Sequence, residues 1–146
     1  MSSQKVDPVI KITEGIFLIS APIKKGSARR IQSHSYLLVS EGKGILFDCG
    51  SYVNRHETID NIKKIIDPKN ITHVVISHPD VDTIGCVDEL IKLNPEVNII
   101  TTDKNLPLLS TFLPDSVKLT VLTESEHIIK LNNLNIVFIL TPNVHT

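Results

Sequence analysis

The sequence predicts one α/β domain built on a mixed β-sheet, and three observations support this class. β-Branched runs alternate with amphipathic helical segments in the middle of the chain, which is typical of parallel strands joined by helices. Turn signals between apolar runs near both ends predict antiparallel hairpins in addition. The length of 146 residues suits one domain or a large part of one, so we treat residues 1–146 as a single domain.

Nine apolar runs of strand length are expected to form the sheet. Tight turns are predicted between three pairs of neighbouring runs, at residues 13–15 (TEG), 41–44 (EGKG) and 132–133 (NN). The run ITHVVIS is nearly continuous, as expected for a strand buried on both faces. The expected strands are Val9–Ile12, Ile16–Ser20, Tyr36–Ser40, Ile45–Cys49, Ile71–Ser77, Val97–Thr101, Val117–Leu122, Ile128–Leu131 and Leu134–Leu140.

Three helices are expected between the central strands. Isoleucines at helical spacing predict the first helix over Arg55–Ile66, which ends before the DPKN turn. The second fits from about Thr83 to Leu93. Asp103 is expected to cap a third, short helix that runs through Phe112.

Composition excludes several functional classes. The chain is 41% hydrophobic and 21% charged, the balance of a globular protein. A net charge of -1 argues against bulk electrostatic binding to nucleic acid or to anionic membranes. Because no membrane span and no secretory signal pattern is visible, a cytoplasmic location is expected. Cys49 and Cys86 are too few for a disulfide framework and are expected to be reduced, buried thiols.

The stretch ISHPDVDTIG at 76–85 contains the main chemical signal. His78, Asp80 and Asp82 alternate, so in an extended segment their side chains point the same way. One imidazole and two carboxylates suit zinc, iron or manganese. Two adjacent carboxylates would otherwise repel each other, a cost that a divalent cation removes. The spacing therefore predicts a metal site at the end of a buried strand.

Other interpretations of the same residues remain open at this stage. Asp82 is able to cap the following helix, Asp80 to make a turn, and His78 to serve a structural role. DVDT also has some similarity to a phosphotransfer loop with Asp80 as nucleophile and Asp82 as acid. In that loop the threonine would come one position later, and no polar SHP would precede the aspartate.

The wider segment ITHVVISHPDVDTIGCVDEL resembles the signature region of the metallo-β-lactamase superfamily, His-x-His-x-Asp-His followed by a glycine and a helix. His78, Asp82 and Gly85 match that pattern. SHSYLLVSEGKGILFDCGS resembles the superfamily hairpin that ends in an Asp-x-Gly turn at Asp48. The resemblance spans nearly the whole chain and implies a metallo-β-lactamase-like αββα sandwich, of which this would be the N-terminal portion.

Within the superfamily, the sequence is most similar to flavodiiron proteins and related oxygen-binding diiron proteins. These carry His-x-Glu-x-Asp-His-x-Gly, and Asp80 occupies the place of the glutamate. Their next ligand follows Pro-x-x-His, which PNVH at 142–145 matches. The resemblance implies that His78, Asp80 and His145 bind one metal, that Asp82 binds the other, and that Asp48 orients ligand imidazoles. The alternative for Asp48 is a simple turn residue.

By resemblance, the metal would be iron, with two ions, and the ligand dioxygen or nitric oxide. In such proteins a flavin domain or another redox partner delivers electrons. A diiron oxidoreductase or an oxygen-binding sensor is therefore expected. The alternatives are a zinc-dependent hydrolase of the same superfamily, in which a metal-bound water attacks an ester, thioester or amide, and a scaffold that has lost its metal.

Two departures from the pattern concern the second metal. Thr83 stands where that metal expects a histidine, and the chain stops at Thr146, before the bridging aspartate and last histidine of the family. We therefore expect Thr83 to weaken the second site more than the first. Thr83→His should raise metal stoichiometry if the later ligands are present. An uncovered sheet face in such an N-terminal portion would favour a homo-oligomer.

Overall fold

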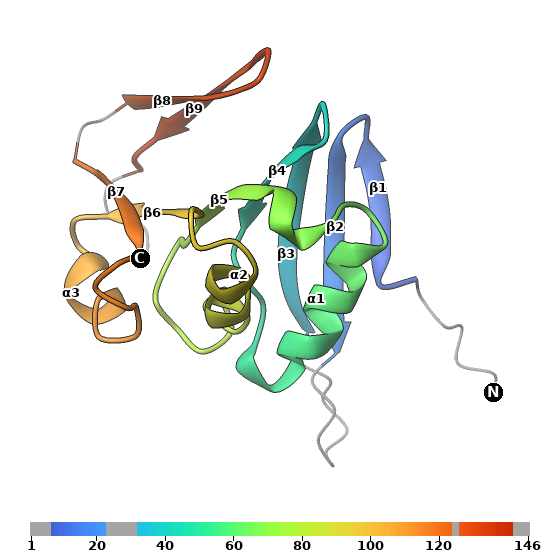
Figure 1. Cartoon of the computed structure of the whole chain (residues 1–146), viewed down its shortest axis with the longest axis horizontal. Helices are drawn as coiled ribbons and strands as arrows, with labels where there is room; N and C mark the ends of the chain where they lie inside the picture. The colour runs from blue at the N-terminus through green and yellow to red at the C-terminus, as the bar shows by residue number, and fades with distance from the viewer. Residues whose placement is uncertain (1–6, 23–31, 124–125, 142–146) are drawn as a thin grey trace.

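A seven-stranded sheet organises the fold, with its strands side by side in chain order (Figure 1). The structure is a computed structural model that describes residues 7–22, 32–123 and 126–141. A separate hairpin, β8 (Glu126–Leu131) and β9 (Leu134–Ile139), follows the sheet. The strands of the sheet are β1 (Val9–Thr13), β2 (Ile16–Pro22), β3 (Gln32–Ser40), β4 (Lys43–Phe47), β5 (Ile71–Val75), β6 (Asn98–Thr102) and β7 (Lys118–Leu122).

The sheet is mixed, as the sequence predicted. Strands β1 to β4 are antiparallel, whereas β4, β5, β6 and β7 pair in parallel. Glu41 and Gly42 both adopt positive φ, 47° and 76°, in the turn between β3 and β4, the conformation that a two-residue hairpin turn of type I′ requires. Strand β3 begins at Gln32, earlier than predicted, because its polar first half pairs with the end of β2.

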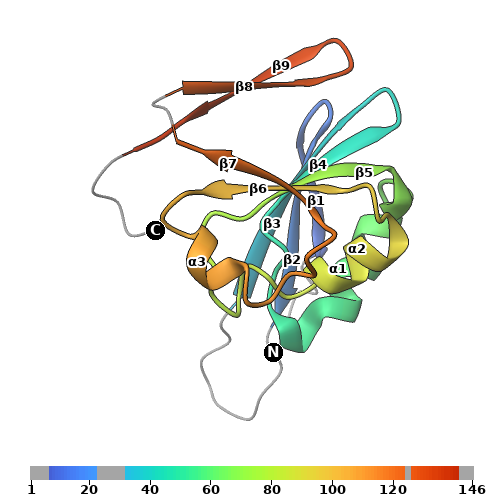
Figure 2. The same cartoon turned by 60° about the vertical axis from the view of Figure 1, so that its left-hand side comes forward.

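Two helices cover one face of the sheet: α1 (Arg55–Lys63) and α2 (Val87–Leu93) (Figures 1 and 2). The short helices η1 (Tyr52–Asn54), η2 (Pro68–Asn70) and α3 (Leu106–Leu109) complete the connections. Apolar side chains of the sheet and helices form the core, and its fully buried members include Leu37, Leu46, Ile62, Ile71, Val74, Leu90 and Ile99. Cys49 and Cys86 belong to it as free thiols, as predicted.

Two of the predicted helix starts are wrong. Helix α2 begins at Val87 rather than near Thr83. In a helix from Thr83 the carbonyl of that residue would accept from Val87 N–H, but it accepts instead from Cys49 N–H in the loop after β4. Helix α3 is capped at Asn105, not Asp103, whose carboxylate instead accepts a hydrogen bond from the N–H of Lys104. No helix among the described residues is long and apolar enough to cross a membrane.

The β8–β9 hairpin lies on the face of the sheet opposite α1 and α2 (Figure 2). Along β4, Leu46 points into the helix-covered core, so its neighbour Phe47 points the other way. There Phe47 stacks on Phe138 of β9, with 6.3 Å between ring centroids. At the hairpin tip, the Asn132 side chain donates a 2.6 Å hydrogen bond to the carbonyl of Ser40. The second face of the sheet is therefore partly covered from within the chain.

His73 lies in β5, as a sheet histidine with a satisfied ring nitrogen. Its Nδ1 is 2.8 Å from Thr72 Oγ1, and burial lowers its pKa below the usual 6.5. Below that pH the unfolded chain takes up a proton more readily than the folded one. The stability that neutral His73 contributes is therefore complete above pH 6.5 and lost as the pH falls.

We expect His73→Gln to lose less unfolding free energy than the unaltered chain when the pH falls from 7 to 5. Urea titration at each pH measures this free energy. An equal loss in both proteins would contradict the expectation.

Candidate metal centre

The loop that follows β5 holds the predicted metal ligands. Residues 77–86 form bends and turns rather than the extended segment assumed from the sequence. The N–H groups of Thr83 and Ile84 both donate to the carbonyl of Asp80, at 3.0 and 3.3 Å. This tight turn, and not strand geometry, determines which way the side chains point. Asp82 does not cap α2, which begins five residues later at Val87 with Cys86 as its N-cap.

Three ligand atoms converge at this turn. His78 Nε2 lies 3.7 Å from Asp80 Oδ2 and 3.8 Å from Asp82 Oδ1. All three residues offer atoms within 4.8 Å of one another. The two carboxylates are exposed, whereas the His78 side chain is only 28% exposed and is held by the loop. The predicted set is thus brought together, except for His145, which lies outside the described residues.

The donor set fits a divalent transition metal. Bonds of about 2.0–2.2 Å from nitrogen and carboxylate oxygens place neighbouring ligand atoms roughly 3.0–3.5 Å apart around one ion. The separations of 3.7 and 3.8 Å exceed this by a few tenths of an ångström. Because both aspartates are exposed, a small rotation of each would bring their oxygens into range. The arrangement is open toward solvent, which leaves room for further ligands.

A serine connects the cluster to the loop after β4. Ser77 donates twice to Asp48, from its N–H to Oδ1 and from its hydroxyl to Oδ2, both at 2.9 Å. Ser77 Oγ is also 2.9 Å from His78 Nδ1. Since an ionised carboxylate only accepts, the serine proton goes to Asp48 and Ser77 Oγ accepts from Nδ1–H. In a neutral His78 with its proton on Nδ1, Nε2 is the nitrogen that a metal would bind.

Asp48 lies at the exit of β4, and its side chain reaches the ligand loop. It adopts a positive φ of 58°, and its N–H donates to the carbonyl of Val75 at 2.8 Å. Burial raises the pKa of its carboxyl, and the hydrogen bonds from Ser77 oppose that rise. The nearby charges act in opposite directions: His78 lowers the pKa and Asp82 raises it. Asp48 is thus a turn residue whose side chain also holds Ser77.

Ser77→Ala should weaken metal binding while leaving the ligands in place. The substitution removes the acceptor of His78 Nδ1–H, so neither the tautomer nor the ring orientation is fixed. Loss of such an outer hydrogen-bond partner typically costs about 10–100-fold in affinity. Isothermal titration with Zn²⁺ measures the effect, and Ser110→Ala serves as a control because its hydroxyl donates to the carbonyl of Pro107 in α3. If Ser77→Ala and the unaltered chain bound Zn²⁺ with equal affinity, the proposed support of His78 by Ser77 and Asp48 would be wrong.

Gly85 fixes the ligand loop against the loop after β4. Its N–H donates to the carbonyl of Gly50 at 2.8 Å, and Cys86 N–H donates to the carbonyl of Cys49 at 3.2 Å. A Cβ at position 85 would overlap backbone atoms of Gly50, Ser51 and Tyr52. The two loops are therefore in backbone contact, which only glycine at this position allows.

Cys49, in the loop after β4, is buried beside Cys86. This burial raises the pKa of the Cys49 thiol and keeps it protonated.

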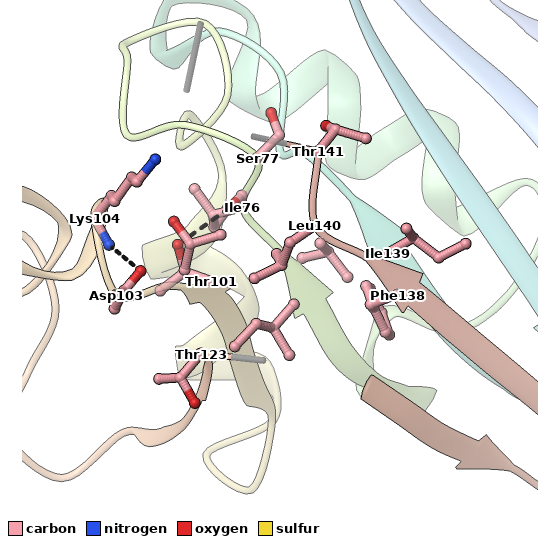
Figure 3. A pocket seen from close by; sticks show the side chains of 13 residues that line it. Ile76, Ser77, Thr101, Asp103, Lys104, Thr123, Phe138, Ile139, Leu140 and Thr141 are labelled. Atoms are coloured by element: carbon pink, nitrogen blue, oxygen red, sulfur yellow. Dashed lines mark hydrogen bonds between the residues drawn. The ribbon is translucent and has the colours of Figure 1, made fainter. Parts of the chain in front are cut away.

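A cavity of about 520 Å³ lies beside the cluster, between the carboxyl ends of β5, β6 and β7 and strand β9 (Figure 3). Ile76, Leu122, Phe138 and Leu140 give it an apolar lining, and threonines and Lys104 add polar groups. Ser77 reaches it, whereas none of the three cluster residues lines the described part. Among the described residues, the cavity therefore adjoins the centre at Ser77.

Sequence reasoning missed two supporting residues. Ser77 was treated as part of the motif, without a role of its own. Asn105 donates from its side chain to the carbonyl of Ser77 at 2.8 Å and so anchors the same loop from the segment between β6 and α3. For Ser77, adjacency to a proposed ligand was an available signal. Asn105 is far from the motif in the sequence, and only the parallel pairing of β5 with β6 brings it close.

The order of the sheet and the ligand loop after β5 define a metallo-β-lactamase fold. A flavo di-iron protein from Thermotoga maritima, in a substituted form, superposes with a TM-score of 0.76 at 23% identity, covering 92% of this chain and 36% of that one. A substituted metallo-β-lactamase from Cronobacter sakazakii gives 0.69 at 16% identity, over 88% and 52%. At these identities the likeness concerns the fold.

The family follows from the sequence comparison. A family model described as ODP family beta lactamase matches residues 31–146, and the chain belongs to that family. It is 27% identical to an uncharacterized protein of Methanocaldococcus jannaschii over 77% of this chain and 28% of that protein. It is 25% identical to a diflavin flavoprotein of Synechocystis, over 77% and 19%. The chain thus spans less than a third of the length of these relatives.

Proposed function

We propose that the chain forms a non-haem iron site of the flavodiiron kind, at which dioxygen or nitric oxide binds. The convergence of His78 Nε2 with the carboxylates of Asp80 and Asp82 carries this proposal. Membership in the ODP family and similarity to proteins named as flavodiiron proteins support the choice of iron. Bound iron would supply an open coordination position and electrons for the diatomic ligand.

Each proposed ligand residue would contribute to the site in a different way. His78 would provide a neutral nitrogen, oriented through Ser77 and Asp48. Asp80 and Asp82 would supply two negative charges, which offset the charge of a divalent ion and make its binding favourable. Exposure of both carboxylates leaves the ion accessible to a small molecule. His145 is proposed as a further ligand on the strength of the sequence resemblance.

Electrons for reduction would come from a separate flavin-containing or other redox partner, as the names of the relatives suggest. A second proposal is that copies of the chain associate. The outer side of the β8–β9 hairpin exposes the apolar side chains of Ile128, Val137 and Ile139, and Ile139 is 70% exposed. Burial of this apolar side would be favourable. Light scattering coupled to size exclusion measures the molar mass that results.

A zinc-dependent hydrolase is the second candidate. One relative is a ribonuclease of Thermus thermophilus, 26% identical over 64% of this chain and 22% of that protein. One nitrogen and two carboxylate oxygens suit zinc as well as iron. On this hypothesis His78, Asp80 and Asp82 would bind zinc, and His78 would have the same orientation as in the iron site. The cavity beside Ser77, whose lining includes Asp103 and Lys104, would then have to admit an organic substrate.

Metal analysis combined with gas binding separates these candidates. The protein is purified under nitrogen, loaded with Fe²⁺ or Zn²⁺, and analysed for retained metal. The proposal predicts stable retention of iron and a visible absorption change when nitric oxide is added. Retention of zinc together with thioester or phosphodiester turnover would favour the hydrolase. A chain that retains neither metal would contradict both functions and leave a scaffold.

A further inference from the structure

Thr83 is buried, and all of its polar groups form hydrogen bonds within the protein. Its side chain is 5% exposed, and its hydroxyl lies against the carbonyls of His78 and Asp80, 3.0 Å from the latter. Its N–H donates to the same Asp80 carbonyl, and its own carbonyl accepts from Cys49 N–H at 2.5 Å. Every polar group of Thr83 thus holds the ligand loop closed or ties it to the loop after β4.

A residue bonded in this way does not serve as a metal ligand. A threonine hydroxyl does not ionise near neutral pH, and here its proton is shared between two backbone carbonyls. The carboxylate oxygens of Asp80 and Asp82 instead converge with His78 Nε2 on one position. Among the described residues, no other group of three ligand side chains comes together. The local chemistry provides for one ion.

We propose that Thr83 clamps the ligand loop, replacing the ligand expected for a second metal, and that this loop holds a single divalent cation. This inference rests on the proposed function, since it assumes that the loop binds a metal. The clamp gives the loop its closed turn before the cation arrives. Less conformational freedom is then lost on binding, which raises the affinity for the one remaining ion.

Three substitutions test the clamp, using the full chain and Mn²⁺ alone as the probe. Thr83→Val keeps the shape of the side chain and removes its hydroxyl, whereas Thr83→Ser keeps the hydroxyl. Thr58→Val is the matched control, because Thr58 is 1% exposed and its hydroxyl donates to the carbonyl of Asn54 at 3.1 Å rather than to the ligand loop. Binding is followed by the electron paramagnetic resonance signal of free Mn²⁺, and folding by thermal melting.

The clamp predicts that Thr83→Val weakens Mn²⁺ binding about tenfold or more, by analogy with other residues that support metal ligands. Thr83→Ser should stay within about twofold of the unaltered chain. Thr58→Val should lower the melting temperature without changing Mn²⁺ affinity. Equal affinities for Thr83→Val and Thr83→Ser would overturn the clamp, and so would an equal loss of affinity in Thr58→Val.

Stoichiometry tests the second half of the proposal. The unaltered chain should bind one Mn²⁺ ion, with the spectrum of an isolated ion and no exchange coupling. Two coupled ions per chain would overturn the single-cation inference and leave the proposed function intact. No bound ion would instead contradict the proposed function itself. If Thr83→Val does not fold, this measurement on the unaltered chain still decides between one ion and two.

Discussion

Replacing Gly85 by alanine is expected to destabilise the protein by about 3 kcal/mol or more, a large part of the roughly 5–15 kcal/mol of a typical domain. The added methyl group would overlap backbone atoms of Gly50, Ser51 and Tyr52, none of which is the flexible end of a side chain. To make room, the ligand loop would have to move away from the loop after β4. Its hydrogen bond to Gly50 would then be lost. Urea denaturation measures the change in unfolding free energy.

Gly42→Ala is the matched control for this effect. Gly42 has a positive φ of 76°, but no atom lies within 4 Å of an added methyl group. Its substitution should therefore cost only the strain of the left-handed conformation, about 1–2 kcal/mol. Gly85 does not have a positive φ, so its larger loss would come from the overlap alone. A Gly85→Ala variant as stable as Gly42→Ala would show that the two loops are not packed as described.

Replacing His78 by alanine is expected to reduce divalent metal affinity about 100-fold or more, beyond the effect of an outer hydrogen-bond partner. His78 supplies the nitrogen among the three converging atoms, and two carboxylates alone would retain only weak binding. Because the side chain is 28% exposed, the variant should still fold. Isothermal titration with Zn²⁺ measures the affinity.

His56→Ala is the control for His78→Ala. His56 lies in α1, is 71% exposed and pairs with Glu89 at 3.2 Å. It should bind Zn²⁺ in the protein too weakly to affect the titration. If His78→Ala and His56→Ala both retained the affinity of the unaltered chain, the bound ion would lie elsewhere. The centre at 78–82 would then be wrong.

Hydrophobic periodicity predicted the strands well because their side chains alternate between two surroundings. Every predicted strand is present, and the turn residues Gly42 and Asn132 adopt the positive φ that their positions suggested. The mixed sheet and the metallo-β-lactamase class also follow from the sequence, and the structural neighbours confirm both. Local pattern was sufficient for β3 to β6, each of which contains buried side chains, whereas the largely exposed β1 was located by the turn at 13–15.

The helix starts failed for a reason that lies outside local sequence. A helix from Thr83 would need the Thr83 carbonyl to accept from Val87 N–H, yet this carbonyl accepts from Cys49 N–H in the loop after β4. A contact with a distant segment thus competes with the first turn of α2. The convergence of His78, Asp80 and Asp82 was predicted, but from an extended geometry that the loop does not have. The turn closed by Asp80 produces it instead.

The interpretation of Thr83 changed most between sequence and structure. The sequence shows a ligand position filled by a hydroxyl, which suggests only a loss. The structure shows that the hydroxyl closes the ligand loop. Thr83→His would therefore add an imidazole and remove the clamp at once. Its effect on metal stoichiometry remains a prediction, whereas the internal bonds of Thr83 are a feature of the fold.

The iron content of two proteins, loaded anaerobically with Fe²⁺ and then desalted, tests the metal centre most directly. One is the unaltered chain and the other carries Asp80→Asn together with Asp82→Asn, which keeps the size of both exposed side chains and removes their charge. We expect about one iron per unaltered chain and none above background in the double variant. Equal iron in both, or none in either, would contradict a metal centre at His78, Asp80 and Asp82.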